Sequence, residues 1–189
     1  MTITLIRHGQ TDWNAAGLFQ GSTDIPLNDV GRAQARAAGE ALVAAGTPWQ
    51  FVVSSPLVRA RETAAIIAET LGLELGPTIP QLVERHYGDF EGKLVDPLAY
   101  EHESVEKMRS VIARGYAGIE QVESEFTQPT LVVAHGTIIR YTLNDMAGAT
   151  PREQVIPTIE NGTLSTVQRD GLGAWQVVSV NVQPEPITA

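Results

Sequence analysis

The sequence contains no cysteine, and this absence removes several kinds of chemistry at once. Disulfide bonds, a thiol nucleophile and a zinc site built on thiolates are all excluded. No apolar run approaches the length needed to span a membrane. The N-terminus also lacks the basic start and long apolar core of a secretory signal. We therefore expect a cytoplasmic protein that does not associate with membranes.

Positive charge is scarce as well, because 13 Lys and Arg residues stand against 22 Asp and Glu, giving a net charge of −9. Such a charge disfavours binding to nucleic acids and anionic membranes. Any anionic ligand must therefore be captured by a local cluster of cationic groups. The 189 residues suffice for one domain with a complete core. We see no repeat or linker that would divide 1–189.

Apolar segments alternate with helical patterns along most of the chain. Strands are predicted at 3–6, 51–54, 130–134, 163–168 and 175–182. Helices are predicted at 29–45, from the N-cap Ser55 to Leu71, at about 103–123, and from Gly136 to Gly148. The Gly- and Asn-rich stretch 10–26 indicates a long loop. This alternation predicts an α/β three-layer sandwich, in which helices cover both faces of a mainly parallel central sheet.

Chemically active side chains follow three of these strands. Arg7 and His8 follow the first, Arg59 the second and His135 the third. Because ligands of such sheets bind beyond the carboxyl ends of the strands, we expect these side chains to converge. Guanidinium forks suit phosphate oxygens, and a neutral imidazole can act as a nucleophile. Glu84 is our candidate for the carboxyl group that would protonate a leaving alcohol.

Five segments, taken in order, resemble the motifs of the histidine phosphatase superfamily, the phosphoglycerate-mutase-like proteins. They are Leu5-Ile6-Arg7-His8-Gly9-Gln10-Thr11 with Asn14; Gln20-Gly21 with Asp24, Leu27 and Gly31; Ser55-Pro56-Leu57-Val58-Arg59-Ala60 with Thr63-Ala64; Leu82 and Glu84 with Gly88 and Glu91-Gly92; and Val132-Val133-Ala134-His135-Gly136 with Arg140. Each motif alone is a weak signal, whereas five in the right order are a strong one.

The resemblance implies a phosphohistidine intermediate on His8. It also implies phosphate binding by Arg7, Arg59 and His135, and proton transfer by Glu84. Further substrate contacts are predicted for a second set of residues, namely Asn14, Gln20, Gly21, Arg85 and Thr137. No metal or organic cofactor is implied. The expected partner is a small phosphorylated metabolite, and the sequence is compatible with a homodimer.

Two activities compete within this family. The segment Glu84-Arg85-His86-Tyr87-Gly88 resembles the version found in cofactor-dependent phosphoglycerate mutases. The region between Glu84 and His135, however, holds only a short cap insertion at about 85–128, without the proline-rich insert of the mutases. Because a mutase must exclude water from its phosphoenzyme, we predict a phosphomonoester hydrolase, with the phosphoglycerate mutase as the alternative.

Two readings from other classes are weaker. A metal-dependent hydrolase would be built on the four histidines His8, His86, His102 and His135, but these lack a helical ligand spacing. A non-catalytic module that binds phosphorylated ligands would tolerate the loss of His8 or Glu84. All five expected catalytic residues are present, which favours an enzyme.

Overall fold

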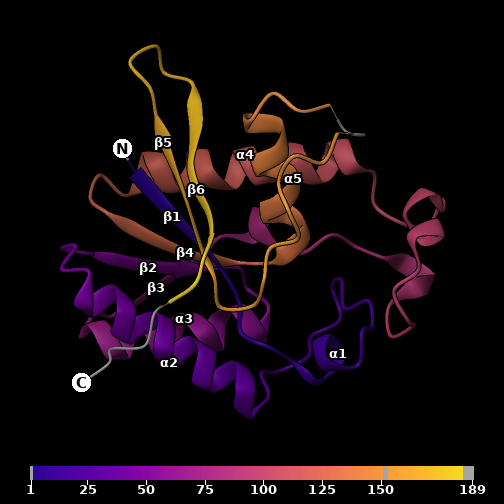
Figure 1. Ribbon diagram of the computed structural model, residues 1–189, viewed down its shortest axis with the longest axis horizontal. Helices are drawn as coiled ribbons and strands as arrows, with labels where there is room; N and C mark the ends of the chain where they lie inside the picture. The colour runs from indigo at the N-terminus through magenta and orange to yellow at the C-terminus, as the bar shows by residue number, and fades with distance from the viewer. Residues whose placement is uncertain (1, 151–152, 185–189) are drawn as a thin grey trace.

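A single six-stranded sheet forms the centre of the computed structural model, which describes residues 2–150 and 153–184 (Figure 1). Its strands are β1 (Thr2–Arg7), β2 (Phe51–Ser54), β3 (Leu75–Thr78), β4 (Thr130–Ala134), β5 (Leu164–Arg169) and β6 (Trp175–Val182). They lie in the order β3-β2-β4-β1-β5-β6. The first four are mutually parallel, whereas β5 and β6 pair antiparallel to their neighbours. The mainly parallel sheet is thus confirmed.

Helices cover both faces of this sheet. They are α1 (Asp12–Ala15), α2 (Asp29–Ala44), α3 (Val58–Leu71), α4 (Met108–Glu125) and α5 (Gly136–Met146), with the short 3₁₀ turns η1 (Pro80–Leu82), η2 (Gly88–Phe90) and η3 (Pro97–Glu101). In Figure 1, α4 and α5 lie above the sheet, and α2 and α3 lie below it. Leu5 packs into the upper hydrophobic cluster and Ile6 into the lower one. Because successive residues of a strand face opposite sides and helices cover both, the four residues from Ile3 to Ile6 of β1 are all buried, and the predicted three layers are confirmed.

Some predicted boundaries differ from the structure. The helix predicted from Ser55 begins only at Val58, and its N-cap residue Leu57 makes no side-chain cap bond. The predicted loop 10–26 contains α1, whose Thr11 and Asn14 form a capping box. The helix predicted from residue 103 starts at Met108 instead. Strand β3 was not predicted, because its glycine and proline lower strand propensity and are tolerated at a sheet edge.

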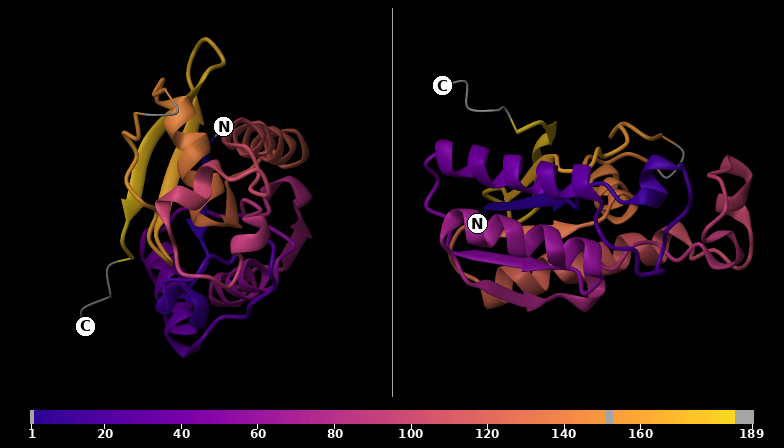
Figure 2. Two further views of the ribbon diagram at one scale, coloured as in Figure 1. Left: turned by 90° about the vertical axis from the view of Figure 1, so that its right-hand side faces the viewer. Right: turned by 90° about the horizontal axis from the view of Figure 1, so that it is seen from below.

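The segment 85–107 extends past the ends of the parallel strands, at the right of Figure 1 and of the right-hand view in Figure 2. Its apolar and aromatic residues form a small cluster with Phe19: Tyr87, Phe90, Ala99, Tyr100 and Val105. Residues 108–125 of the predicted cap are instead α4, whose Val111 and Ile119 belong to the main core. Only the first half of the predicted cap insertion therefore stands outside the three layers.

Among residues 2–150 and 153–184, none of the helices has both the length and the apolar character needed to cross a bilayer.

Candidate active site

A cleft of about 330 Å³ opens where β1 and β4 end. Eight of the predicted site residues line it: Arg7, His8, Asn14, Gln20, Gly21, Arg59, Glu84 and Thr137. Two others, His135 and Arg85, are buried and are not among the residues that line it. The expected convergence at the carboxyl edge of the sheet therefore occurs, and the position of each group can be traced to particular contacts.

His8 follows β1 directly and is only 2% exposed. Its Nδ1 lies 2.7 Å from the carbonyl oxygen of Gly9. Because a carbonyl can only accept, Nδ1 carries the proton and Nε2 keeps its lone pair. Burial lowers the pKa of His8 well below its ordinary value, and the charges of Arg59 and Arg7 lower it further. The imidazole is thus neutral at neutral pH, as a nucleophile must be.

The turn after His8 is held by unusually close backbone contacts. A Cβ atom on Gly9 would lie 2.3 Å from the carbonyl oxygen of Gly31 in α2, so only glycine fits there. The Gly9 N–H donates to Thr63 Oγ1 at 3.1 Å, and that hydroxyl donates to the Arg59 carbonyl at 2.8 Å. The turn that carries His8 is thereby tied to the first turns of both α2 and α3.

His135 follows β4 and is fully buried. Its ring centroid lies 5.1 Å from that of His8, because β1 and β4 are adjacent and Arg7 is in register with Ala134. Nε2 of His135 pairs with Ser55 Oγ at 2.7 Å, while its buried Nδ1 has no partner among the described residues. Burial and the charge of Arg59 lower the pKa of His135 well below its ordinary value. A neutral ring that accepts from Ser55 would offer Nδ1–H as a donor.

Arg7 ends β1 and places its guanidinium beside the start of α5. One terminal nitrogen donates to the carbonyl of Ile159. A Cβ atom on Gly136 would approach Arg7 Nε to 3.1 Å, so the absence of a side chain at 136 makes room for the guanidinium. Nε of Arg7 is buried and has no hydrogen-bond partner within the described part of the chain. This donor suits an oxyanion in the cleft.

Arg59 lies in the first turn of α3 and is fully buried. Its Nη2 donates to the Gly21 carbonyl at 2.7 Å, and its Nη1 donates to the Thr23 carbonyl at 2.9 Å. The loop that carries these carbonyls is held by Glu91, whose carboxylate accepts the backbone N–H groups of Ser22 and Thr23 at 3.0 and 2.9 Å. The direction of the Arg59 guanidinium is therefore fixed by the loop and not by α3 alone.

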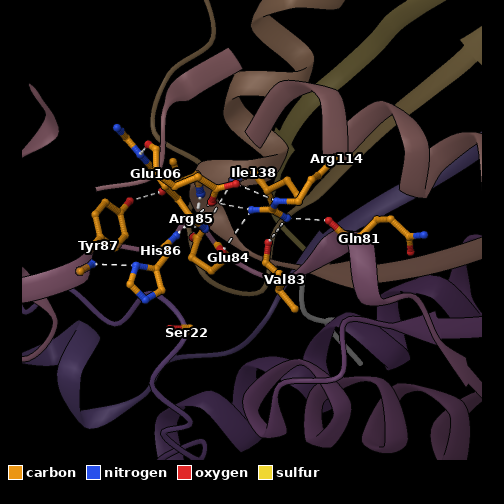
Figure 3. Close-up of polar contacts among 12 residues, drawn as sticks. Ser22, Gln81, Val83, Glu84, Arg85, His86, Tyr87, Glu106, Arg114 and Ile138 are labelled. Carbon is orange, nitrogen blue, oxygen red and sulfur yellow. Dashed lines mark hydrogen bonds and ion pairs between the residues drawn. The ribbon is translucent and has the colours of Figure 1, made fainter. Parts of the chain in front are cut away.

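Glu84 sits at the N-terminus of α5 (Figure 3). Its Oε2 accepts from the Thr137 N–H at 2.9 Å, and its Oε1 accepts from the N–H groups of Ile138 at 3.1 Å and Arg85 at 2.8 Å. The Thr137 hydroxyl also pairs with the Tyr87 hydroxyl at 2.6 Å. The carboxyl group is thus fixed in the wall of the same cleft that His8 lines.

Asn14 and Gln20, two of the predicted substrate contacts, line the cleft with side-chain amides that are already partly hydrogen-bonded. Asn14 Oδ1 accepts from the Thr11 N–H at 3.2 Å and from Asn161 Nδ2 at 3.3 Å. Gln20 Oε1 accepts from the Thr11 hydroxyl at 2.9 Å. Both side-chain oxygens are therefore occupied, and their amide nitrogens are the groups available to a ligand in the cleft.

Arg85 is 2% exposed and does not line the cleft. Its guanidinium donates to the carbonyls of Glu106 and Tyr100 at 2.8 and 3.0 Å and to the Tyr141 hydroxyl at 3.3 Å. It also lies 5.2 Å from the ring centre of Tyr100 and 5.7 Å from that of Tyr87. This environment supports a role for Arg85 in holding the aromatic wall, rather than the direct substrate contact that we predict from the sequence.

Several lining residues carried no recognised signal in the sequence. They are mostly apolar or aromatic: Leu18, Phe19, Val95, Tyr100, Tyr141, Thr158 and Ile159. Ser55 was placed in a motif, but its bond to His135 could not be foreseen, since it depends on strand pairing. Asn161 is not among the predicted site residues, yet its Nδ2 donates to the His8 carbonyl at 2.9 Å.

Metal ligation was considered for the same region. The described ranges contain no group of three or more His, Asp or Glu side chains arranged to hold an ion. His86 and His102, which the metal-dependent alternative requires, are exposed and do not line the cleft. The structure therefore offers that alternative no ligand set in the part of the chain that it describes.

Imidazoles and guanidinium groups around one cleft of a three-layer α/β fold are the groups that an enzyme transferring phosphoryl groups through a histidine requires. Residues 3–183 match the family model of the histidine phosphatase superfamily, branch 1. The chain belongs to that superfamily, which confirms the resemblance found in the sequence and the prediction of a histidine phosphatase-type enzyme.

Individual relatives include both kinds of enzyme. A Bacillus subtilis protein named "Uncharacterized phosphatase PhoE" is 36% identical over 188 residues, covering 95% of this chain and 94% of that protein. A 2,3-bisphosphoglycerate-dependent phosphoglycerate mutase 2 of Gloeobacter violaceus is 32% identical over 172 residues, covering 80% and 78%. A solved mycobacterial glucosyl-3-phosphoglycerate phosphatase, complexed with VO3, superposes with a TM-score of 0.84 at 26% identity, covering 96% of this chain and 98% of that one. The main prediction, a phosphatase, is supported, and the mutase alternative is not better supported.

Proposed function

We propose that this protein hydrolyses phosphomonoesters of small metabolites through a phosphohistidine on His8. The observation that carries the proposal is the tautomer of His8, whose Nδ1–H is held by the Gly9 carbonyl. This bond leaves the Nε2 lone pair for phosphorus, in a cleft that Arg7 and Arg59 also line. The two guanidinium groups, with Nδ1–H of His135, would hold the equatorial oxygens as charge builds up on them.

The reaction then has two steps. In the first, Nε2 of His8 bonds to phosphorus, the bond to the leaving oxygen breaks, and Glu84 gives that oxygen a proton. In the second, Glu84 takes a proton from water, the water oxygen bonds to phosphorus, and the bond to Nε2 breaks. Inorganic phosphate leaves, and His8 and Glu84 return to their starting states. No metal or organic cofactor enters this scheme.

The outer part of the cleft favours a hydrolase over a mutase. Beyond Arg7 and Arg59, its described lining residues carry one cation, Arg140, among apolar and aromatic side chains. Arg140 Nε already donates to the Ile156 carbonyl at 3.0 Å. A doubly phosphorylated cofactor would need more positive charge than this to be bound in the same cleft.

The bounds of the cap, the cellular location and the partners of the enzyme are also proposals. We limit the cap to 85–107, because α4 belongs to the helical layer. A cytoplasmic location and the absence of nucleic-acid and membrane partners remain predictions from composition and charge. The sequence is compatible with a homodimer and leaves the oligomeric state open.

A substrate screen tests the proposed function. Phosphomonoesters, including sugar phosphates and phosphoglycerates, would be assayed for phosphate release with and without 2,3-bisphosphoglycerate. A coupled assay would follow the conversion of 3- to 2-phosphoglycerate in parallel. We expect phosphate release that does not depend on the bisphosphate. Efficient isomerisation with little phosphate release would replace the proposal by the mutase alternative.

A further inference from the structure

The backbone that carries Glu84 is held by the side chain of Arg114, a residue of α4 (Figure 3). Arg114 Nη1 donates to the carbonyls of Gln81 at 2.6 Å and Val83 at 2.9 Å. Its Nη2 reaches the Glu84 carbonyl at 3.4 Å. One guanidinium thus binds three carbonyl oxygens of one short segment, and it also makes two bonds to Glu106. A lysine ammonium has only three donors and cannot make all of these bonds.

Glu106 fixes Arg114 in this position. Arg114 Nε donates to Glu106 Oε1 at 2.9 Å, and Nη2 donates to Oε2 at 2.8 Å, so the ion pair is bidentate. The side chains are only 25% and 19% exposed. Burial acts to raise the pKa of Glu106, but the hydrogen bond and charge of Arg114 outweigh it and leave that pKa below its ordinary value. Both partners are therefore charged at neutral pH.

Glu106 also binds the chain on the other side of Glu84. Its Oε2 accepts the His86 N–H at 3.2 Å, and its backbone N–H donates to the His86 carbonyl at 2.9 Å. Its own carbonyl accepts Arg85 Nε at 2.8 Å. The segment from Gln81 to His86 is thus held on both sides of Glu84 by the same ion pair.

This segment needs such support, because residues 83–87 form neither helix nor strand. The carboxyl group of Glu84 is anchored to α5, whereas its backbone is anchored to α4. Neither Arg114 nor Glu106 lines the cleft, so neither is in a place to bind substrate. We propose that the Arg114–Glu106 pair is a positioning device, which holds the 81–86 backbone so that Glu84 reaches the leaving-group oxygen. The inference rests on the proposed role of Glu84.

Leaving-group dependence separates this role from a merely structural one. Arg114→Lys would be compared with the unchanged protein on β-glycerol phosphate, whose alkoxide needs a proton, and on p-nitrophenyl phosphate, whose phenolate needs little. The phosphorylation of His8 would be timed by rapid quenching. We expect a loss of about tenfold or more for the alkyl ester, and less than about twofold for the nitrophenyl ester, because only the former depends on the placement of Glu84.

A double-mutant comparison sharpens the test. In a Glu84→Gln background, Arg114→Lys should cost the alkyl ester less than about twofold further, since the acid is already gone. Arg109→Lys is the matched control. Arg109 lies on the same helix and is exposed, and its side chain makes no hydrogen bond or ion pair with the described residues. It should leave both substrates unaffected.

A second variant guards against loss of folding. Glu106→Gln keeps the size of the side chain and one acceptor, and it should produce the same leaving-group pattern more weakly. Unchanged vanadate inhibition in either variant would show that the phosphate site is intact. Equal losses on both esters, or losses that add fully to those of Glu84→Gln, would overturn the inference. If Glu84→Gln itself showed no leaving-group dependence, the acid role in the proposed function would fail instead, and the inference with it.

Discussion

Replacing Arg59 is the sharpest test of the phosphate site. The side chain is fully buried, and two of its N–H groups are used by the carbonyls of Gly21 and Thr23. The remaining donors, including the unpartnered Nε, are available to phosphoryl oxygens. Removing one such donor from a transition state typically costs a hundred- to a thousandfold in turnover, or about 3 to 4 kcal/mol. We therefore expect Arg59→Ala to lower kcat by at least about a hundredfold.

Arg59→Lys should recover little of this loss. A lysine has a compact ammonium in place of a fork, so it cannot bond both carbonyls and an oxyanion in the same geometry. We expect it to regain less than about a tenth of the lost turnover, with KM changed less than kcat. The assays are steady-state kinetics and vanadate inhibition, with thermal unfolding to confirm that the variants fold.

Arg61→Ala provides the control, because Arg61 is exposed on the same helix. It should keep kcat/KM within about threefold. Near-normal kinetics and vanadate affinity in Arg59→Ala would refute the reasoning and make Arg59 a structural residue that only ties α3 to the 20–24 loop.

Three further predictions concern the histidines and the absence of a metal. His8→Ala should abolish both turnover and phosphoryl uptake, and an acid-labile phosphoenzyme formed by this variant would contradict the role of His8. Activity should survive exhaustive EDTA treatment and be inhibited by vanadate, whereas a loss reversed by a divalent ion would favour the metal-dependent reading. The free energy of unfolding should fall as the pH drops below about 6.5, because burial lowers the pKa of His8 and His135 in the folded state and the unfolded chain then binds the extra protons. Each histidine should contribute a slope of up to about 1.4 kcal/mol per pH unit, and denaturant titrations that stay flat from about pH 6.5 to 5 would contradict this expectation.

The convergence of the site was predictable because it follows from strand order alone. Arg7 and Ala134 are in register, so the next residues, His8 and His135, leave neighbouring strands side by side. Strands of a parallel sheet run in the same direction and are buried on both faces, so they appear in the sequence as short apolar runs. Such runs are easy to recognise in this chain. The parallel pairing of β2 with β4 likewise brings Ser55 to His135, since the Ser55 N–H donates to the Val133 carbonyl at 2.8 Å. The prediction that Ser55 is a helix N-cap did not include this contact with His135, which depends on the pairing of two strands.

Residues that act across long sequence separations could not be predicted in this way. In the sequence, Arg114 and Arg109 are both basic residues of one amphipathic helix. Only the structure distinguishes them, because Arg114 donates to the carbonyls of Gln81 and Val83, which lie 33 and 31 residues earlier in the chain. Tyr100 and Tyr141 likewise come together around Arg85 from separate elements. Such contacts have no period or spacing that a single sequence displays.

The cap shows why the choice between hydrolase and mutase depends on packing rather than on the catalytic groups. Its inward side chains, such as Tyr87 and Tyr100, pack on Phe19 at the cleft wall. Its outward side chains remain in solvent, and Leu98 is 83% exposed while Leu94 is 71% exposed. A cap that sealed the cleft would bury such apolar groups against the opposite wall. Because His8 lines the open cleft, we expect a phosphohistidine there to react with water without the opening of a lid.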